Sequence, residues 1–313
     1  MYALRSIKTI TIEREGFSLN ERYDYEIYVD AGIDADFAYM EDNGVHLIPM
    51  KYSIDGKEFI MNRVPTEEEL RYFYTKMKEG SITGTSQITP FTYEKEFGEA
   101  VKEGKKILYI ALSSGLSSTY SSSLTGMQSV LDEYPDAQIE CVDSLGATAG
   151  IALLMQLAVN NRNAGMSLSD NAECLRQSAL KVSYWFIVED LQYLKRGGRI
   201  SSTAAFAGNV LNLKPILKIN DEGKLINISK QRGVPRGIKY LLECYEIAHD
   251  DTPLPDVYVV NANCPERGQK IADEVVKINP NAVIHQLSIG PVIGAHTGPG
   301  FVALIHFGNR DAR

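Results

Sequence analysis

The sequence predicts an α/β protein of two domains, an N-terminal domain with a parallel sheet and a C-terminal domain with a mixed sheet. The 313 residues are more than one small hydrophobic core requires. Apolar strands alternate with helices between residues 105 and 163, which is typical of right-handed βαβ units. The second half adds hairpins to such units, which favours a mixed sheet. We expect an N-terminal extension over residues 1–24, one domain over 25–165 and a second over 166–313, with the boundary in the polar stretch NRNAGMSLSD.

The first domain is predicted to begin with a strand over residues 25–30. A strand and a hairpin turn at Asp55-Gly56 follow in residues 45–59. A helix over 65–80 starts with a proline and acids and ends at Gly80, and the segment 81–90, SITGTSQITP, is predicted to be a loop. Thr89 is expected to cap the next helix, with Pro90 at its first position.

The strongest strand signal is KKILYIAL, residues 105–112, a nearly continuous apolar run that is typical of a strand covered on both faces. The helix after it is expected to bury one apolar stripe, which comprises Leu116, Tyr120, Leu124, Met127 and Leu131. A strand over 137–143 and a helix opening at SLGATAG, residues 144–150, complete the domain.

The second domain mixes helices, strands and a hairpin. A helix over 167–182 leads into the strand 183–188, and a short helix within 189–201 ends at two glycines. The stretch 213–233 predicts a hairpin that turns at Asp221-Glu222-Gly223. Helices over 234–250 and 265–279 alternate with strand-like segments at 256–262, 282–290 and 301–308, and residues 295–300, AHTGPG, are predicted to form a turn-like loop.

Composition excludes several classes of function. The net charge is −8 without a long basic run, so a nucleic-acid partner is disfavoured. No apolar run reaches the roughly 18 residues of a membrane helix, and the N-terminus lacks the apolar core of a signal peptide. The four cysteines lie far apart without a CxxC pair, so neither a metal nor a redox motif is indicated. We therefore expect a cytoplasmic protein with free thiols and no integral membrane segment.

Three stretches rich in hydroxyls or glycines come directly before predicted helices, namely Thr83–Thr89, Ser113–Ser118 and Asp143–Thr148. In open α/β sheets, ligands bind beyond the carboxyl ends of the strands, where the N-termini of helices favour anions. Hydroxyls and backbone N–H groups there can hold one carboxylate. The alternative for any single serine or threonine is an ordinary helix cap, and that alternative stays open.

An enzymatic alternative is a serine-dependent acyl hydrolase with Ser114 as nucleophile and His296 as base. The stretch SSGLSST lacks the GxSxG pattern, and neither a P-loop nor a GxGxxG after a strand is present. The other histidines of apolar segments, His46, His285 and His306, are interpreted as structural. Arg199 follows KRGG, where the end of a helix is as good an explanation as a functional role.

Taken together, seven stretches resemble the DegV family of bacterial fatty-acid-binding proteins. They are TGTSQITP (83–90), LSSGLSSTYSSS (112–123), VDSLGATAG (142–150), LQYLKRGGRIS (191–201), NLKPIL (212–217), KQRG (230–233) and HTGPG (296–300). They occur in the family's order at similar spacing over residues 25–308. The resemblance implies two α/β domains that enclose one long-chain fatty acid and no other cofactor. It also implies a non-catalytic carrier in phospholipid metabolism, which presents the carboxylate to a separate ATP-binding fatty acid kinase subunit.

The resemblance also assigns residues. Thr85, Ser114 and His296 match the family positions that hold the carboxylate. The head-group region is expected to include four neighbouring residues, Ser86, Ser113, Arg199 and Thr297. Arg232 matches a position that contacts the kinase. The stretch VDAGIDAD (29–36) departs from the family's TDSTAD-like pattern because it lacks both hydroxyls.

Overall fold

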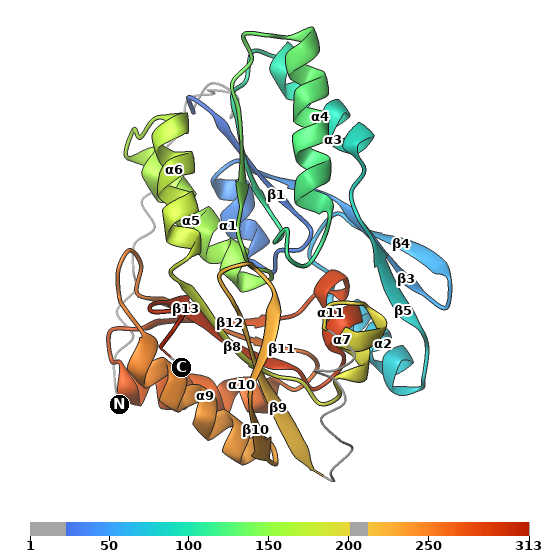
Figure 1. Cartoon of the computed structure of the whole chain (residues 1–313), viewed down its shortest axis with the longest axis vertical. Coiled ribbons are helices and arrows are strands. Elements are labelled where there is room, and N and C mark those ends of the chain that lie inside the picture. The colour runs from blue at the N-terminus through green and yellow to red at the C-terminus, as the bar shows by residue number, and fades with distance from the viewer. Residues whose placement is uncertain (1–22, 201–211, 313) are drawn as a thin grey trace, which may run out of the picture.

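The computed structural model describes residues 23–200 and 212–312, and it consists of two main sheets with helices packed around and between them (Figure 1). The predicted extension over residues 1–24 therefore lies almost entirely outside the described residues. Among the described residues, no helix is long and apolar enough to cross a membrane. All four cysteines, which lie in this part of the chain, are free.

The first sheet is parallel throughout, as the sequence predicted, and its strand order is β2-β1-β6-β7. Its strands are β1 (Glu26–Asp30), β2 (Val45–Ile48), β6 (Ile107–Ala111) and β7 (Ile139–Asp143). Both β1 and β6 are completely buried, because helices cover both faces of the sheet. These helices are α3 (Pro90–Lys102), α4 (Thr119–Glu133), α5 (Ala149–Asn163) and α6 (Leu168–Ala179), and the short α1 (Phe37–Asp42) leads into β2.

The second sheet is mixed, which confirms the predicted fold class, and has the order β10-β9-β8-β13-β11-β12. Among the described residues, β11 pairs with β12 in parallel and the other neighbouring strands of this sheet pair antiparallel. The strands are β8 (Val182–Ile187), β9 (Leu213–Ile219), β10 (Leu225–Arg232), β11 (Asp256–Asn261), β12 (Val283–Ser288) and β13 (Val302–Phe307). The helices α9 (Val234–Ala248) and α10 (Pro265–Ile278) cover one face over a separate apolar core that contains Trp185.

Helix α5 lies between the two sheets and contacts strands of both. Every residue from Ala149 to Val159 is buried except Gln156, because the helix has no face toward solvent over this length. One hydrophobic core consequently runs from the first sheet to the inner face of the second. Helix α6 lies after the predicted boundary at residue 165, yet it packs on β6 and β7 of the first sheet. The boundary itself stays a prediction.

A third, antiparallel sheet of order β4-β3-β5 contains one segment that the sequence analysis assigned wrongly. The predicted turn is present between β3 (Met50–Ile54) and β4 (Lys57–Met61), with positive φ at Asp55 (49°) and Gly56 (80°). Residues Thr83–Ser86, predicted as loop, form strand β5 and pair with β3. The sequence TGTS carries no strand signal of its own, so distant pairing determines its conformation.

The N-termini of α2 (Glu67–Lys78) and α3 are determined by capping residues in the local sequence. Thr66 caps α2 in a reciprocal capping box with Glu69. Thr89 caps α3 by accepting a hydrogen bond from the N–H of Thr92, and Pro90 is the first helical residue, as predicted.

The predicted apolar stripe of α4 is wrong in part. The fully buried face carries small side chains, Thr119, Ser122, Ser123 and Gly126, together with Val130, whereas Leu124 is exposed. The cause is the close approach of α3: a Cβ added at Gly126 would lie 2.6 Å from both the Pro90 carbonyl oxygen and the Tyr93 Cβ. Only small residues permit this helix spacing, so the apolar residues flank the contact instead.

Two short helices carry glycine-rich motifs of the second half. Helix α7 (Gln192–Arg196) ends at Gly197 and Gly198, and Gly198 has the positive φ (73°) expected after a helix. Residues Pro291–Thr297 form α11, so His296 lies in the last turn of a helix and not in the predicted loop. The loop begins only at Gly298, where φ is 76°.

The α3–α4 contact predicts opposite effects for two glycines. Gly126→Ala should lower the free energy of unfolding by about 1–3 kcal/mol, because the new methyl group overlaps backbone atoms. Gly98→Ala, on the facing helix, is the matched control, since its nearest neighbour, the Val130 Cγ2, would lie 3.8 Å away. That control should leave stability unchanged or raise it by up to about 1 kcal/mol. Urea unfolding of both variants measures this, and equal effects would contradict the packing described here.

Candidate functional site

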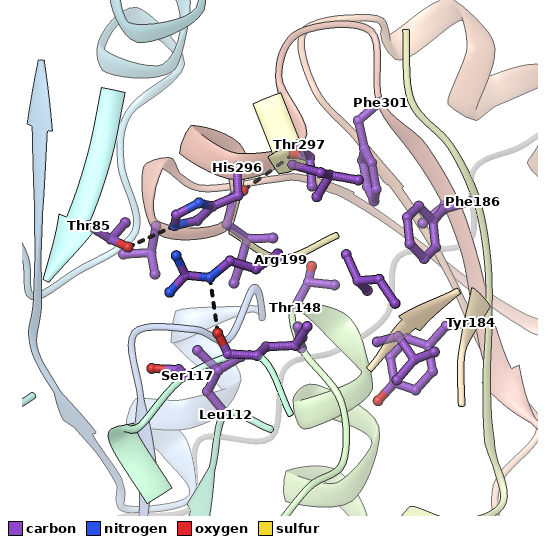
Figure 2. Close-up of a pocket in the computed structure, with 18 of the residues that line it drawn as sticks. Thr85, Leu112, Ser117, Thr148, Tyr184, Phe186, Arg199, His296, Thr297 and Phe301 are labelled. Atoms are coloured by element: carbon purple, nitrogen blue, oxygen red, sulfur yellow. Dashed lines mark hydrogen bonds between the residues drawn. The ribbon is translucent and has the colours of Figure 1, made fainter. Parts of the chain in front are cut away.

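A cavity lies between the first half of the chain, which contains the parallel sheet, and the second half, which contains the mixed sheet (Figure 2). From the first half its wall takes residues of β5 and of the segments that follow β6 and β7; from the second half it takes residues of β8, β13, α11 and the β9–β10 hairpin. Figure 2 shows Thr85 and His296 on one side of this cavity and Tyr184 and Phe186 on the opposite side. The two ends differ in chemistry: polar side chains gather at the first and apolar ones at the second.

The polar end contains Thr85, Gln87, Ser117, Arg199 and His296. A hydrogen bond of 2.7 Å joins the Thr85 Oγ1 to the His296 Nε2 and so connects β5 to α11. This places two of the three predicted carboxylate ligands in direct contact. The cluster offers hydroxyl, imidazole and guanidinium groups within one half-buried region.

His296 is an uncharged group in this environment. Burial, and secondarily the positive charge of Arg199, lower its pKa to about 4, so the imidazole is neutral near pH 7. The ring is held tightly, because a Cβ at Gly197 would come 2.2 Å from the His296 Nδ1. A glycine at position 197 is therefore required for the observed ring position.

Arg199 is the main source of positive charge in the cavity wall. Its Nε donates to the Leu116 carbonyl oxygen at 3.0 Å and its Nη1 donates to the Gly197 carbonyl oxygen. Within residues 23–200 and 212–312, no carboxylate forms an ion pair with this guanidinium, and burial lowers its pKa. A half-buried cation without a counter-charge favours an anionic ligand.

Helix α11 owes its position to contacts from the first half. The Gly290 N–H, just before the helix, donates to the Asp34 Oδ1 at 2.7 Å, and the Thr148 hydroxyl donates to the other carboxyl oxygen at 2.5 Å. The Tyr74 hydroxyl donates to the Ile289 carbonyl oxygen at 2.9 Å. Asp34 is buried, and this burial raises its pKa to about 6. The VDAGIDAD stretch thus positions the helix that carries His296.

The opposite end of the cavity is apolar. Residues of β8 and β13 that face α5 supply Tyr184, Phe186, Ala303 and Ile305, and Phe301 precedes β13. Ile219 and Leu225 come from the β9–β10 hairpin, which covers this end. An elongated ligand fits this cavity if its apolar part lies along these side chains and its polar end lies near His296.

Ser113 fastens that hairpin rather than lining the cavity. Its hydroxyl donates to the Gly223 carbonyl oxygen at 2.9 Å, and the Gly115 N–H donates to the Ser113 Oγ at 3.1 Å. A Cβ at Gly115 would lie 2.5 Å from the Glu222 carbonyl oxygen, so the glycine permits the close contact. The SSG stretch therefore joins the first half to the tip of the hairpin.

The other predicted site residues lie as follows. Thr297 is buried and lines the cavity together with Arg199. Ser114 and Ser86 are exposed and are not among the lining residues. Arg232 is exposed at the end of β10. The structure brings Thr85, Arg199, His296 and Thr297 together; the predicted ligand role of Ser114 has no support in this geometry and stays a prediction.

Gln87, Ser117 and Thr148 are polar residues of the wall that were not singled out from the sequence. Ser117 lies three positions after Ser114 in the same hydroxyl-rich stretch, and Thr148 ends the third such stretch. The pattern identified the stretches but not the members that face inward, because adjacent hydroxyls are equivalent in sequence.

The arrangement also bears on the hydrolase alternative. In the described residues His296 bonds to Thr85, and no carboxylate bonds to its ring to orient it as a base. Ser114 donates its backbone N–H to the Asp143 Oδ1 at 3.1 Å and is exposed. The geometry therefore gives no support to a Ser114–His296 pair.

Comparison with known proteins identifies the family. A family model described as "Uncharacterised protein, DegV family" matches residues 24–308. The chain belongs to the DegV family. A DegV domain-containing protein of Clostridium perfringens is 35% identical over 285 residues, which cover 91% of this chain and 98% of that protein.

Solved DegV structures share the fold. A Thermotoga maritima protein whose structure revealed a fatty acid binding function aligns with a TM-score of 0.77 at 26% identity, over 91% of this chain and 100% of that one. The B3 protein of the Streptococcus pneumoniae fatty acid kinase, loaded with linoleic acid, aligns with a TM-score of 0.78 over 90% of this chain and 99% of that one. At 18% identity the latter likeness shows the DegV fold alone.

The buried carboxyl of Asp34 predicts a specific dependence of stability on pH. Its pKa is about 6 in the folded protein against 3.8 for an unperturbed aspartate, so the folded state retains the proton between these values. This group should therefore lower the free energy of unfolding as pH rises from about 4 to 6. Asp34→Asn keeps an acceptor for Gly290 and removes the charge, so its stability relative to wild type should increase over that range and then stay constant. Asp42→Asn, at an exposed position, is the control for loss of a negative charge. Thermal unfolding at several pH values measures this, and a difference independent of pH would contradict it.

Proposed function

We propose that this DegV protein binds one long-chain fatty acid, with its carboxylate at Thr85, His296 and Arg199 and its tail along the apolar wall. The observation that carries the proposal is a cavity with a half-buried guanidinium at one end and a mainly apolar wall at the other; within the described part of the chain this guanidinium has no carboxylate partner. The fatty acid binding of the Thermotoga maritima relative supports it. A free acyl anion has both features that such a cavity requires.

The two ends contribute differently to binding. Each buried methylene contributes about 0.8 kcal/mol, so the tail supplies most of the affinity. Neutral and charged donors at the polar end compensate the carboxylate for its lost hydration and fix its orientation. The head group consequently determines where the carboxylate lies more than how tightly the molecule binds.

The proposal extends to a partner. The protein has the role of a carrier without its own catalytic centre, and a separate ATP-dependent fatty acid kinase subunit phosphorylates the presented carboxylate in the cytoplasm. The polar end of the cavity includes the exposed Gln87, so the carboxylate would lie near the surface. The resemblance of the LSSGLSSTYSSS and HTGPG stretches supports this role, and Arg232 is the proposed contact with the kinase.

The direct test is solvent extraction of freshly purified protein followed by mass spectrometry. One fatty acid per chain is expected, or stoichiometric uptake of added oleate or palmitate by delipidated protein. Absence of both would contradict the proposal. Hydrolysis of acyl esters that disappears in Ser114→Ala would favour the hydrolase instead.

Removing a head-group donor should impair presentation more than binding. A hydrogen bond to a charged group contributes about 1.5–3 kcal/mol, which is small against a whole acyl chain. His296→Ala and Thr85→Ala should therefore still purify with lipid, while acyl phosphate formation falls at least tenfold because the carboxylate is no longer held in line with ATP. Lipid content and kinase-dependent phosphate transfer are measured on the same samples. Full phosphorylation of His296→Ala would show that this histidine does not position the carboxylate.

Arg232→Ala should have the reverse effect. The side chain is exposed at the end of β10 and does not line the cavity, so lipid content should stay at the wild-type level. The affinity for the kinase subunit should fall, by about tenfold if one charge-assisted contact is lost. Lys270→Ala, which removes an exposed cation from α10, is the matched control. Loss of lipid from Arg232→Ala, or equal kinase binding by both variants, would contradict the assignment.

A further inference from the structure

Tyr184 of β8 belongs to the end of the cavity opposite His296. Figure 2 shows its ring on the far side of the cavity from Thr85. Tyr184 pairs in register with Ile305, and Phe186 pairs with Ala303, so these four side chains share the face of the sheet that lines the cavity. A tail that starts at the polar end and follows this face meets the Tyr184 ring last.

Two glycines of the first half make room for this ring. A Cβ at Gly146 would lie 1.7 Å from the Tyr184 hydroxyl oxygen, and one at Gly150 would lie 1.9 Å from it. The hydroxyl end of the tyrosine therefore fills a notch at the start of α5, and this notch exists only because positions 146 and 150 are glycines. The ring is 2% exposed and cannot swing outward into solvent.

A buried arginine supports the ring. The guanidinium carbon of Arg310 lies 5.5 Å from the centre of the Tyr184 ring, and Arg310 is 2% exposed. This guanidinium donates hydrogen bonds to four backbone carbonyl oxygens, those of Leu145 (3.4 Å), Ala179 (2.6 Å), Val182 (2.9 Å) and Asn220 (3.1 Å). An acyl tail would have to break charge-assisted hydrogen bonds to pass, which apolar contacts do not replace.

We propose that Tyr184, held between the glycine notch and Arg310, closes the inner end of the acyl cavity and sets the longest fatty acid that the protein accepts. The inference rests on the proposed fatty-acid function. A tail that fits is buried along its whole length, whereas the Tyr184 ring blocks the burial of each further methylene. Each methylene left unburied forfeits about fourfold in affinity, so the length limit should be sharp.

The experiment offers an equimolar series of saturated acids, from myristic to behenic, to delipidated protein, and native mass spectrometry reads the bound acids. Wild type should show a steep drop beyond one length. Tyr184→Ala should raise the relative occupancy of the next longer acids on the order of tenfold. The matched control is Tyr258→Ala, which removes a buried tyrosine from the same sheet outside the cavity wall and should keep the wild-type profile.

The outcomes separate this inference from the function beneath it. If wild type takes up none of the acids, the fatty-acid function fails and this inference fails with it. If wild type binds and Tyr184→Ala has the wild-type profile, only the role of Tyr184 is overturned. A crystal structure of wild type with a terminally brominated acid tests the same point without any substitution: the bromine should lie against the Tyr184 ring, and a position beyond that ring or away from it would overturn the proposal.

Discussion

The site depends on the docking of α11, which the second half of the chain supplies, into the first half. Asp34, Tyr74 and Thr83 bind its backbone or the residues just before it, and Thr85 binds its histidine. These contacts span more than 200 residues of sequence, and every one is a hydrogen bond made away from bulk water or only partly exposed to it. The same docking positions the wall of the cavity, so the contacts that join the two halves also determine the geometry of the head-group region.

Electrostatics gives this geometry its selectivity. Among the residues that the structure describes, Arg199 has no carboxylate partner, so a neutral ligand beside it would leave the desolvated cation uncompensated. With an anion present, the guanidinium, the imidazole and the hydroxyl become donors to a charge, and each hydrogen bond strengthens in the low dielectric. The bound anion would also raise the pKa of His296 from its low value, since a negative charge stabilises the imidazolium.

The sequence predicted correctly those elements whose conformation depends on neighbouring residues. The buried strand around Ile110, the cap at Thr89 and the turn at Asp55-Gly56 follow from periodicity and turn chemistry, and all three are confirmed. Strand β5, the helical setting of His296 and the small-residue face around Gly126 depend on partners far along the chain, and the sequence analysis missed them. Each hydroxyl-rich stretch contributes residues to the cavity wall, but only the folded chain separates Ser117, which lines the cavity, from Ser113, which fastens the hairpin.

The central claim is that the ligand binds as an anion that neutralises Arg199. The most direct measurement is an NMR titration of palmitate labelled with ¹³C at the carboxyl carbon and bound to the protein. We expect the bound carboxyl to stay ionised at pH 5, with a pKa below the value of about 4.3 of an unperturbed glutamate, because the guanidinium and the hydroxyl donors stabilise the charge. A bound carboxyl that titrates above pH 5 would contradict this claim, since that is the behaviour of an acid buried without a counter-charge.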